Sequence, residues 1–342
     1  MSTSNHRGRV VFSNNYPIDE AHRLWTEGAF PDYHLFGGPR VEAAGFAVDY
    51  VGPGAGRRHT RLGSRLRGDL GLRRAQQAAI SPGARAAFAA EPTTLAGLAL
   101  MRDAGLWRRP VLALVHPGLP PRRGLLRRAL CGYDVVITMS EMIRRALIDE
   151  LGRDPARTLW APCGPDLTWK GYRPRDGHDI VSSGKTHRDE RTLLAAFGRY
   201  PLPARVHTRD AEGDDRRGPV LVRCRAPYAE VLDDLCAAGV VAIPLKRSDG
   251  TFGLTELNDA LALGKPMIMT RNPFLDVDLE AIGCGRVVEQ GDIDGWVAAL
   301  RDLRSSELRS DMGERGRAFA QSSWNSRLFA DVVLHALELV CP

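Results

Sequence analysis

A glycine-opened helix in the second half of the chain carries the pattern with the clearest chemical meaning. Gly253 precedes a run of good helix formers, which ends in Gly264-Lys265-Pro266 before an apolar strand. The free backbone N–H groups of Leu254 and Thr255 would attract an anion. Asp259 shares a helix face with Thr255, where a carboxylate can accept hydrogen bonds from sugar hydroxyls. The spacing is consistent with a phosphate and ribose site. An ordinary loop, helix and strand of an α/β domain explains it equally well.

Polar residues also follow predicted buried strands, at the edge where a doubly wound parallel sheet binds its ligands. Lys185 and Arg188 come after a strand of the second half, and His116 comes after a strand of the first half. Asn15 and Tyr16 occupy the loop after the first strand of the chain. Each set has a structural alternative. Lys185 and Arg188 would be surface basic residues, and His116 would be a structural histidine. The loop would be a tight turn, which the adjacent Asn14 and Asn15 suit equally well.

Other catalytic patterns are absent from the sequence, and no metal site is predicted. There is no G-x-S-x-G, H-E-x-x-H or P-loop motif, and the Asp-Val-Asp at 276–278 falls in a predicted loop. The six cysteines are scattered and form no C-x-x-C pair, which is typical of reduced thiols in a cytoplasmic protein. Neither a membrane-spanning apolar run nor a secretory signal is visible.

The basic charge of the chain lies in its first half. Residues 1–170 contain 24 Lys and Arg against 15 Asp and Glu, a net charge of +9, whereas the whole chain has +6. Such a surface would steer a phosphorylated acceptor or contact an anionic membrane peripherally. A solvated arginine-rich face is the alternative. Nucleic acid is a poorer partner, because aromatic residues are not interleaved with the basic ones.

The elements that must position these residues follow an α/β order. Strands and helices alternate up to about residue 151, a Pro- and Gly-rich segment follows at 162–174, and the alternation then restarts. With 342 residues, the chain is expected to form two Rossmann-like domains, 1–165 and 166–342, with ligands meeting in the cleft between them. We expect a basic helix at 61–79 and a last helix at 325–340. It is left open whether that last helix crosses back to the first domain.

The order of the motifs resembles that of retaining glycosyltransferases with the GT-B fold. The helix ending in Gly264-Lys265-Pro266 is similar to the nucleotide-sugar element of that family. The strand ending in His116, the Ser140-Glu141 helix start and the 162–166 segment resemble other family motifs in the right order. The resemblance extends over nearly the whole chain.

The resemblance implies roles for the residues of the second domain. Gly184 with Lys185 and Arg188 would form a clamp that neutralises the leaving diphosphate, aided by the N–H groups that follow Gly253. Asp259 would hold the ribose.

The family has a further acidic residue, which contacts the transferred sugar, at the position of Thr251. Threonine cannot serve as a carboxylate; if Thr251 is an insertion, Asp249, two residues earlier, would take this place. In the first domain, His116 would contact the donor sugar near the reacting carbon. Asn15 and Tyr16 would line the acceptor site.

The expected function is therefore transfer of a hexosyl or related sugar from a nucleotide diphosphate-sugar to an acceptor. Retention at the anomeric carbon is implied by the resemblance alone. The reaction would need no metal and no cofactor besides the donor substrate, and the acceptor is a glycan, a lipid or a small natural product. Two alternatives stay open: a nucleotide-sugar epimerase or hydrolase, and a non-catalytic subunit that binds nucleotide-sugars.

Overall fold

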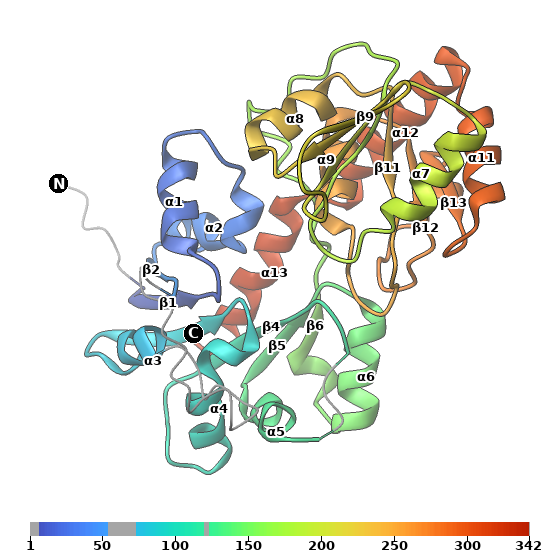
Figure 1. Cartoon of the computed structure of the whole chain (residues 1–342). Helices are drawn as coiled ribbons and strands as arrows, with labels where there is room; N and C mark the ends of the chain where they lie inside the picture. The colour runs from blue at the N-terminus through green and yellow to red at the C-terminus, as the bar shows by residue number, and fades with distance from the viewer. Residues whose placement is uncertain (1–6, 54–72, 120–122, 342) are drawn as a thin grey trace. The chain divides into compact units, whose positions relative to one another are not determined.

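The computed structural model describes residues 7–53, 73–119 and 123–341. The chain divides into two units (Figure 1). The first unit comprises residues 1–166 and 326–342, and the second comprises residues 167–325. The linear division at residue 165 differs from this, because it counts residue 166 and residues 326–342 with the second domain.

The first unit is built on a parallel sheet of six strands in the order β2-β1-β3-β4-β5-β6. All five residues of β4 are buried, as expected for a strand covered by helices on both faces. The strands are β1 (Arg9–Ser13), β2 (Ala47–Val51), β3 (Ala84–Ala89), β4 (Val111–Val115), β5 (Val135–Thr138) and β6 (Thr158–Trp160).

The helices of the first unit include the last helix of the chain. They are α1 (Ile18–Thr26), α2 (Gly38–Ala43), α3 (Arg73–Ile80), α4 (Ala96–Asp103), α5 (Leu125–Gly132), α6 (Glu141–Leu151) and α13 (Ser326–Glu338), with 3-10 turns η1 (Asp32–Leu35), η2 (Pro92–Leu95) and η3 (Pro155–Arg157). Of the basic helix predicted at 61–79, residues 61–72 lie outside the described residues. Helix α13 packs on α2, β5 and β6.

The contact between α13 and α2 depends on a glycine. Gly37 precedes α2 with a φ of 82°, in the left-handed region that glycine adopts without strain. A Cβ at this position would lie 3.0 Å from the Cα of Ala330 in α13. The Ser326 N–H also donates to the Pro165 carbonyl at 3.0 Å, which fixes the start of α13 to the end of the first chain segment of this unit.

The second unit has a sheet of seven strands in the order β13-β12-β11-β7-β8-β10-β9, all parallel except β9. The strands are β7 (Ile180–Ser182), β8 (Ala204–Thr208), β9 (Asp215–Arg217), β10 (Val220–Cys224), β11 (Val240–Ile243), β12 (Met267–Thr270) and β13 (Gly285–Val288). The helices are α7 (Glu190–Arg199), α8 (Tyr228–Cys236), α9 (Leu254–Leu263), α10 (Leu279–Ile282), α11 (Ile293–Asp302) and α12 (Ser306–Ser323).

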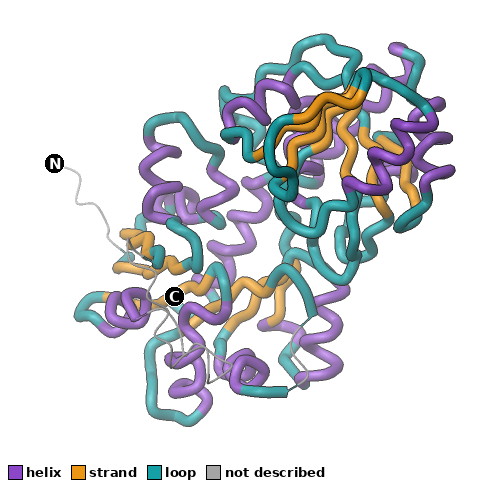
Figure 2. The backbone as a smooth tube through the Cα atoms, viewed as in Figure 1, coloured by secondary structure: helices purple, strands orange, loops and turns teal. Residues whose placement is uncertain are grey.

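The two sheets with their flanking helices confirm the predicted fold class of two Rossmann-like domains (Figure 2). Helix α9 begins and ends where its flanking glycines predict, since Gly253 and Gly264 both have left-handed φ values. Its residues 256–263 are all buried, so α9 is an internal helix. Within the described residues, no helix combines the length and apolar character needed to cross a membrane.

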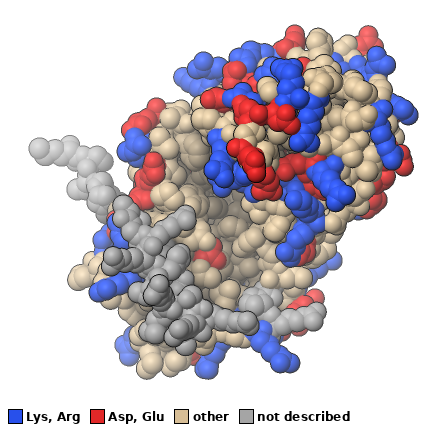
Figure 3. Space-filling model, viewed as in Figure 1, with Lys and Arg blue, Asp and Glu red and all other residues tan. Residues whose placement is uncertain are grey.

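Charges of opposite sign alternate over the visible face of the second unit (Figure 3). Around β9, β10 and α8, Arg223 contacts Asp214 at 2.9 Å and Glu230 at 2.6 Å. Exposed pairs of this kind contribute little to stability. They leave this surface without a patch of one sign, in contrast to the arginine excess of residues 1–170.

Candidate functional site

The loop after β7 is held by the side chain of Arg188. Its Nε donates to the Ser183 carbonyl at 2.9 Å and its Nη1 donates to the Thr186 carbonyl at 2.7 Å. The guanidinium lies directly against Gly184, whose φ is 114° and where a Cβ would collide with it. Gly184 is therefore required both by its backbone conformation and by the closeness of Arg188.

Arg188 also ties this loop to the start of α9. Its Nη2 donates to the carboxylate of Glu256, and the two side chains are only 6% and 9% exposed. Glu256 lies in the first turn of α9, three residues after Gly253. The structure thus brings together two predicted parts of the clamp, the loop at Gly184 and the helix start, through a residue that the sequence analysis did not select.

The loop before α9 is held at the same edge of the sheet. The Asn272 side chain, just after β12, donates to the carbonyls of Gly250 and Phe252, each at 2.9 Å. The His187 ring, which belongs to the loop after β7, meets the Phe252 ring edge-on with 4.5 Å between centroids. Loops that follow β7, β11 and β12 therefore converge beside the first turn of α9, at the ligand edge of a doubly wound sheet.

The first turn of α9 offers backbone donors at this edge. Gly253 has no side chain with which to cap the helix. Leu254 is partly exposed and Thr255 is exposed, so this turn borders solvent. An anion that approaches this turn meets the positive end of the helix dipole.

Asp259 lies one turn further along α9 and is 2% exposed. The Tyr172 hydroxyl donates to its Oδ1 at 2.8 Å. Tyr172 lies in the Pro- and Gly-rich segment at 162–174, and its ring packs edge-on against Trp169 with 5.0 Å between centroids. The neighbouring Asn258 has a structural contact, since its Oδ1 accepts a hydrogen bond from the Trp324 indole at 3.0 Å.

Lys185 and Asp249 both lie on the surface of the second unit. The Asp249 carboxylate accepts a hydrogen bond from Arg247 Nε at 3.0 Å, and this interaction lowers the pKa of Asp249. Thr251, at the position of the family's first acidic residue, is 7% exposed. The acidic side chain that forms an ion pair with the clamp residue Arg188 is Glu256.

In the first unit, His116 lies at the carboxyl end of β4. Its Nε2 is 3.1 Å from the Ala90 carbonyl, and its ring stacks on Phe36 at 6.1 Å. Because a carbonyl only accepts, Nε2 carries the proton and Nδ1 is left as an acceptor. Burial lowers the pKa of His116, and the hydrogen bond to Ala90 partly opposes this effect. The ring is therefore neutral near pH 7.

The loop after β1 is an Asx turn. The Asn14 side-chain oxygen accepts from the Tyr16 N–H at 3.4 Å, and the Tyr16 hydroxyl donates to the His34 carbonyl. Burial raises the pKa of Tyr16, so this hydroxyl stays protonated. Asn15 is exposed. Of the two predicted acceptor residues, Tyr16 is thus engaged with the backbone and Asn15 is presented to solvent.

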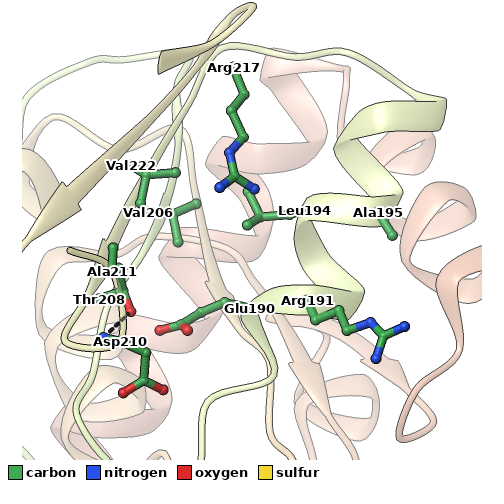
Figure 4. Close-up of a pocket in the computed structure, with 10 residues that line it drawn as sticks. All are labelled: Glu190, Arg191, Leu194, Ala195, Val206, Thr208, Asp210, Ala211, Arg217 and Val222. Atoms are coloured by element: carbon green, nitrogen blue, oxygen red, sulfur yellow. Dashed lines mark hydrogen bonds between the residues drawn. The ribbon is translucent and has the colours of Figure 1, made fainter. Parts of the chain in front are cut away.

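A separate hollow of about 490 Å³ lies between α7 and the β9–β10 hairpin (Figure 4). Its floor includes Leu194, Val206 and Val222, and charged side chains of both signs, such as Glu190 and Arg217, line it. No residue predicted from the sequence as part of the site lies in it. Nor do the residues that the structure describes contain a cluster of three His, Cys, Asp or Glu that could hold a metal ion.

No protein-family description matches the sequence, and no curated protein matches it either. Solved structures match the fold over nearly the whole chain. Sucrose-phosphate synthase from Thermosynechococcus elongatus has a TM-score of 0.73 and 15% identity, with 97% of this chain and 98% of that chain covered.

Anabaena HepE in complex with UDP-glucose has a TM-score of 0.65 and 13% identity, covering 97% of this chain and 100% of that one. Trehalose 6-phosphate synthase from Burkholderia multivorans has a TM-score of 0.67 and 12% identity, covering 98% and 97%. At such identities the likeness concerns the fold alone. The chain has the GT-B fold of these proteins, which confirms at the level of the fold the resemblance seen in its sequence motifs.

Proposed function

We propose that this protein is a glycosyltransferase that moves a sugar from a nucleotide diphosphate-sugar to an acceptor. The observation that carries the proposal is the convergence of the Gly184 loop, the first turn of α9 and Asp259 at the carboxyl edge of the second sheet. The fold shared with HepE, which was solved with UDP-glucose, supports the choice of ligand.

In this proposal the diphosphate binds to the backbone N–H groups that follow Gly253 and to the Lys185 ammonium. Lys185 lies on the exposed part of the loop after β7, where its long side chain can reach an anion. Negative charge grows on the diphosphate as the sugar bond breaks, so a cation at this place stabilises the transition state more than the bound donor. In the empty site Arg188 holds the Gly184 loop in shape, since three of its N–H groups have partners there.

Asp259 is proposed to bind the ribose hydroxyls, with Tyr172 orienting its carboxylate. The sugar contact expected of Asp249 requires that its pairing with Arg247 opens when the donor binds. Such an exposed pair is weak enough to do so, because water competes with it.

His116 is proposed to act on the donor sugar as a neutral hydrogen-bond acceptor through Nδ1. The bond to Ala90 fixes the tautomer that this role needs. Asn15 and Tyr16 are proposed to line the acceptor site, Asn15 by direct contact and Tyr16 by shaping the loop. Transfer with retention, in which the leaving diphosphate takes the acceptor proton, would need no metal and no protein nucleophile.

The arginine excess of residues 1–170 supports an anionic partner for the first unit. We propose a phosphorylated or lipid-linked acceptor, with peripheral contact to the inner membrane face from the cytoplasm. Sedimentation with vesicles that contain anionic lipid, compared with neutral vesicles, tests this contact.

The function is tested first by ligand binding and then by turnover. A thermal-shift series with UDP, ADP, GDP and their glucose conjugates should raise the melting temperature with one base, because a ligand of the native state stabilises it. Lack of a shift with every nucleotide would remove the proposal.

A non-catalytic nucleotide-sugar subunit is the second candidate. It is favoured by Thr251, which replaces an acidic residue of the family, and by the neutralisation of Arg188 by Glu256. Nucleotide binding without product from any acceptor would select it. Conversion of the donor in the absence of an acceptor would instead indicate an epimerase or a hydrolase.

A further inference from the structure

The buried pair between Arg188 and Glu256 neutralises one of the two cations of the clamp. Two of the Arg188 donors, Nε and Nη1, are committed to backbone carbonyls within its own loop. The Nη2 end of the guanidinium is the part directed toward α9, and the Glu256 carboxylate occupies it. Any new anion that approaches Arg188 from the helix side therefore meets a carboxylate that is already in place.

Because of its position, the Glu256 carboxylate competes with an incoming anion for the Arg188 guanidinium. It lies in the first turn of α9, the same turn whose N–H groups attract an anion. Both side chains of the pair are less than 10% exposed, so water screens them little and two anions close to this guanidinium repel each other strongly. A diphosphate at the first turn of α9 must either displace the carboxylate from Nη2 or bind without Arg188.

We propose that Glu256 is a positioning residue that serves as the resident counter-ion of Arg188, and that the diphosphate of the donor replaces it. The inference rests on the proposed function, because the competing ligand is the donor of that reaction. Glu256 holds the Gly184 loop in its binding shape while the site is empty. It also weakens the binding of any diphosphate, because this exchange must precede full contact with Arg188.

The test measures binding of UDP and of inorganic pyrophosphate by calorimetry to the full-length protein and to Glu256→Gln. Glutamine keeps the size and one acceptor oxygen but removes the competing charge. We expect Glu256→Gln to bind both anions about five- to fiftyfold more tightly, as relief of a close like-charge contact implies. Glu307→Gln is the matched control, because it removes the same charge from the exposed first turn of α12. It should change both affinities less than about twofold.

A second pair of variants connects the effect to Arg188. In an Arg188→Gln background, Glu256→Gln should raise affinity less than it does in the wild-type background, because only the like-charge repulsion is relieved and no guanidinium is freed for the anion. Glu256→Asp keeps the charge with a shorter reach and should give an affinity between those of the wild type and Glu256→Gln. It also serves as the readout if Glu256→Gln fails to fold by circular dichroism.

The results of these titrations separate failure of the inference from failure of the proposed function. Unchanged or weaker binding to a folded Glu256→Gln would overturn the inference and leave the proposed function standing, provided that the wild type binds UDP. Pyrophosphate binding that appears only in Glu256→Gln would support the inference and count against the donor site of the wild type. If no variant binds either anion, the inference fails, and the thermal-shift series with the other nucleotides decides on the proposed function.

Discussion

The carboxyl edges of the two sheets are built by different means. In the second unit, a buried ion pair and several side-chain hydrogen bonds fix the loops around α9. In the first unit, His116 bonds to the Ala90 carbonyl and Tyr16 to the His34 carbonyl, and the Glu91 carboxylate after β3 accepts from the Thr93 N–H. A buried cation such as Arg188 suits an anionic ligand whose charge changes during reaction, whereas neutral groups and carboxylates suit hydroxyl groups. The difference supports donor binding by the second unit and acceptor binding by the first.

Arg188→Ala is expected to have the largest effect, because it breaks the ion pair that distinguishes the edge of the second sheet from that of the first. The change leaves the Glu256 carboxylate buried without its partner and leaves Gly184 without the guanidinium that covers it. The free energy of unfolding should fall by about 3–5 kcal/mol, the usual cost of breaking a buried pair from one side. Urea denaturation measures it. A loss below about 1 kcal/mol would mean that the pair is not formed in solution.

Lys185→Ala should lower turnover and leave stability unchanged, because Lys185 is exposed. The loss of electrostatic stabilisation should reduce kcat by about 10- to 1000-fold, or 1.4–4 kcal/mol. Steady-state kinetics with saturating donor measures this, and Lys185→Arg should lose less because the charge remains. Normal turnover in Lys185→Ala would place the diphosphate elsewhere.

Asp259→Asn should weaken donor binding by about 1.5–3 kcal/mol, since charge-assisted hydrogen bonds to ribose are lost. Calorimetric titration with the nucleoside diphosphate measures the change. Tyr172→Phe is a useful partner, because it removes only the hydroxyl that bonds to Asp259 and should weaken binding less. Equal affinity in Asp259→Asn and the wild type would exclude this carboxylate from the site.

The smallest effect on turnover is expected at His116, which lies at the carboxyl edge of the first sheet. His116→Ala should lower kcat about tenfold with little change in donor affinity, because its contact matters chiefly in the transition state. Since burial holds the pKa of His116 below its usual value, the stability that neutral His116 contributes is present above pH 6.5 and is lost as pH falls through that lower pKa. Turnover should accordingly show no histidine titration between pH 7 and 8. A kcat equal to that of the wild type would assign His116 a structural role.

The sequence predicted best what local chemistry determines. Gly253 and Gly264 mark the ends of α9 because glycine alone adopts their left-handed conformations easily, and buried apolar runs predict the parallel strands. The pairing of Arg188 with Glu256 joins residues 68 positions apart, and neither residue type nor spacing signals such a contact. A glutamate in the first helical turn is ordinary and gave no reason to select it.

Long-range packing also decided features that the pattern left open. Strand β9 lies within the charged stretch 209–217, whose side chains are too polar to be read as a strand. It forms because it pairs antiparallel with β10 at the edge of the sheet, where polar residues are tolerated. The predicted helix at 325–340 corresponds to α13, but its association with the first unit depends on the fit of Gly37 against Ala330.

The return of α13 to the first unit has a consequence for biosynthesis. A ribosome releases the 1–166 segment long before it releases Ser326–Glu338, so the sheet of the first unit must wait, with the place of α13 uncovered, while the whole second unit is made. Residues 167–325 are contiguous and can fold as soon as they emerge. The unit that is made first is therefore the one that is finished last. Until α13 arrives, the apolar residues that it covers are exposed, which favours aggregation of the nascent chain.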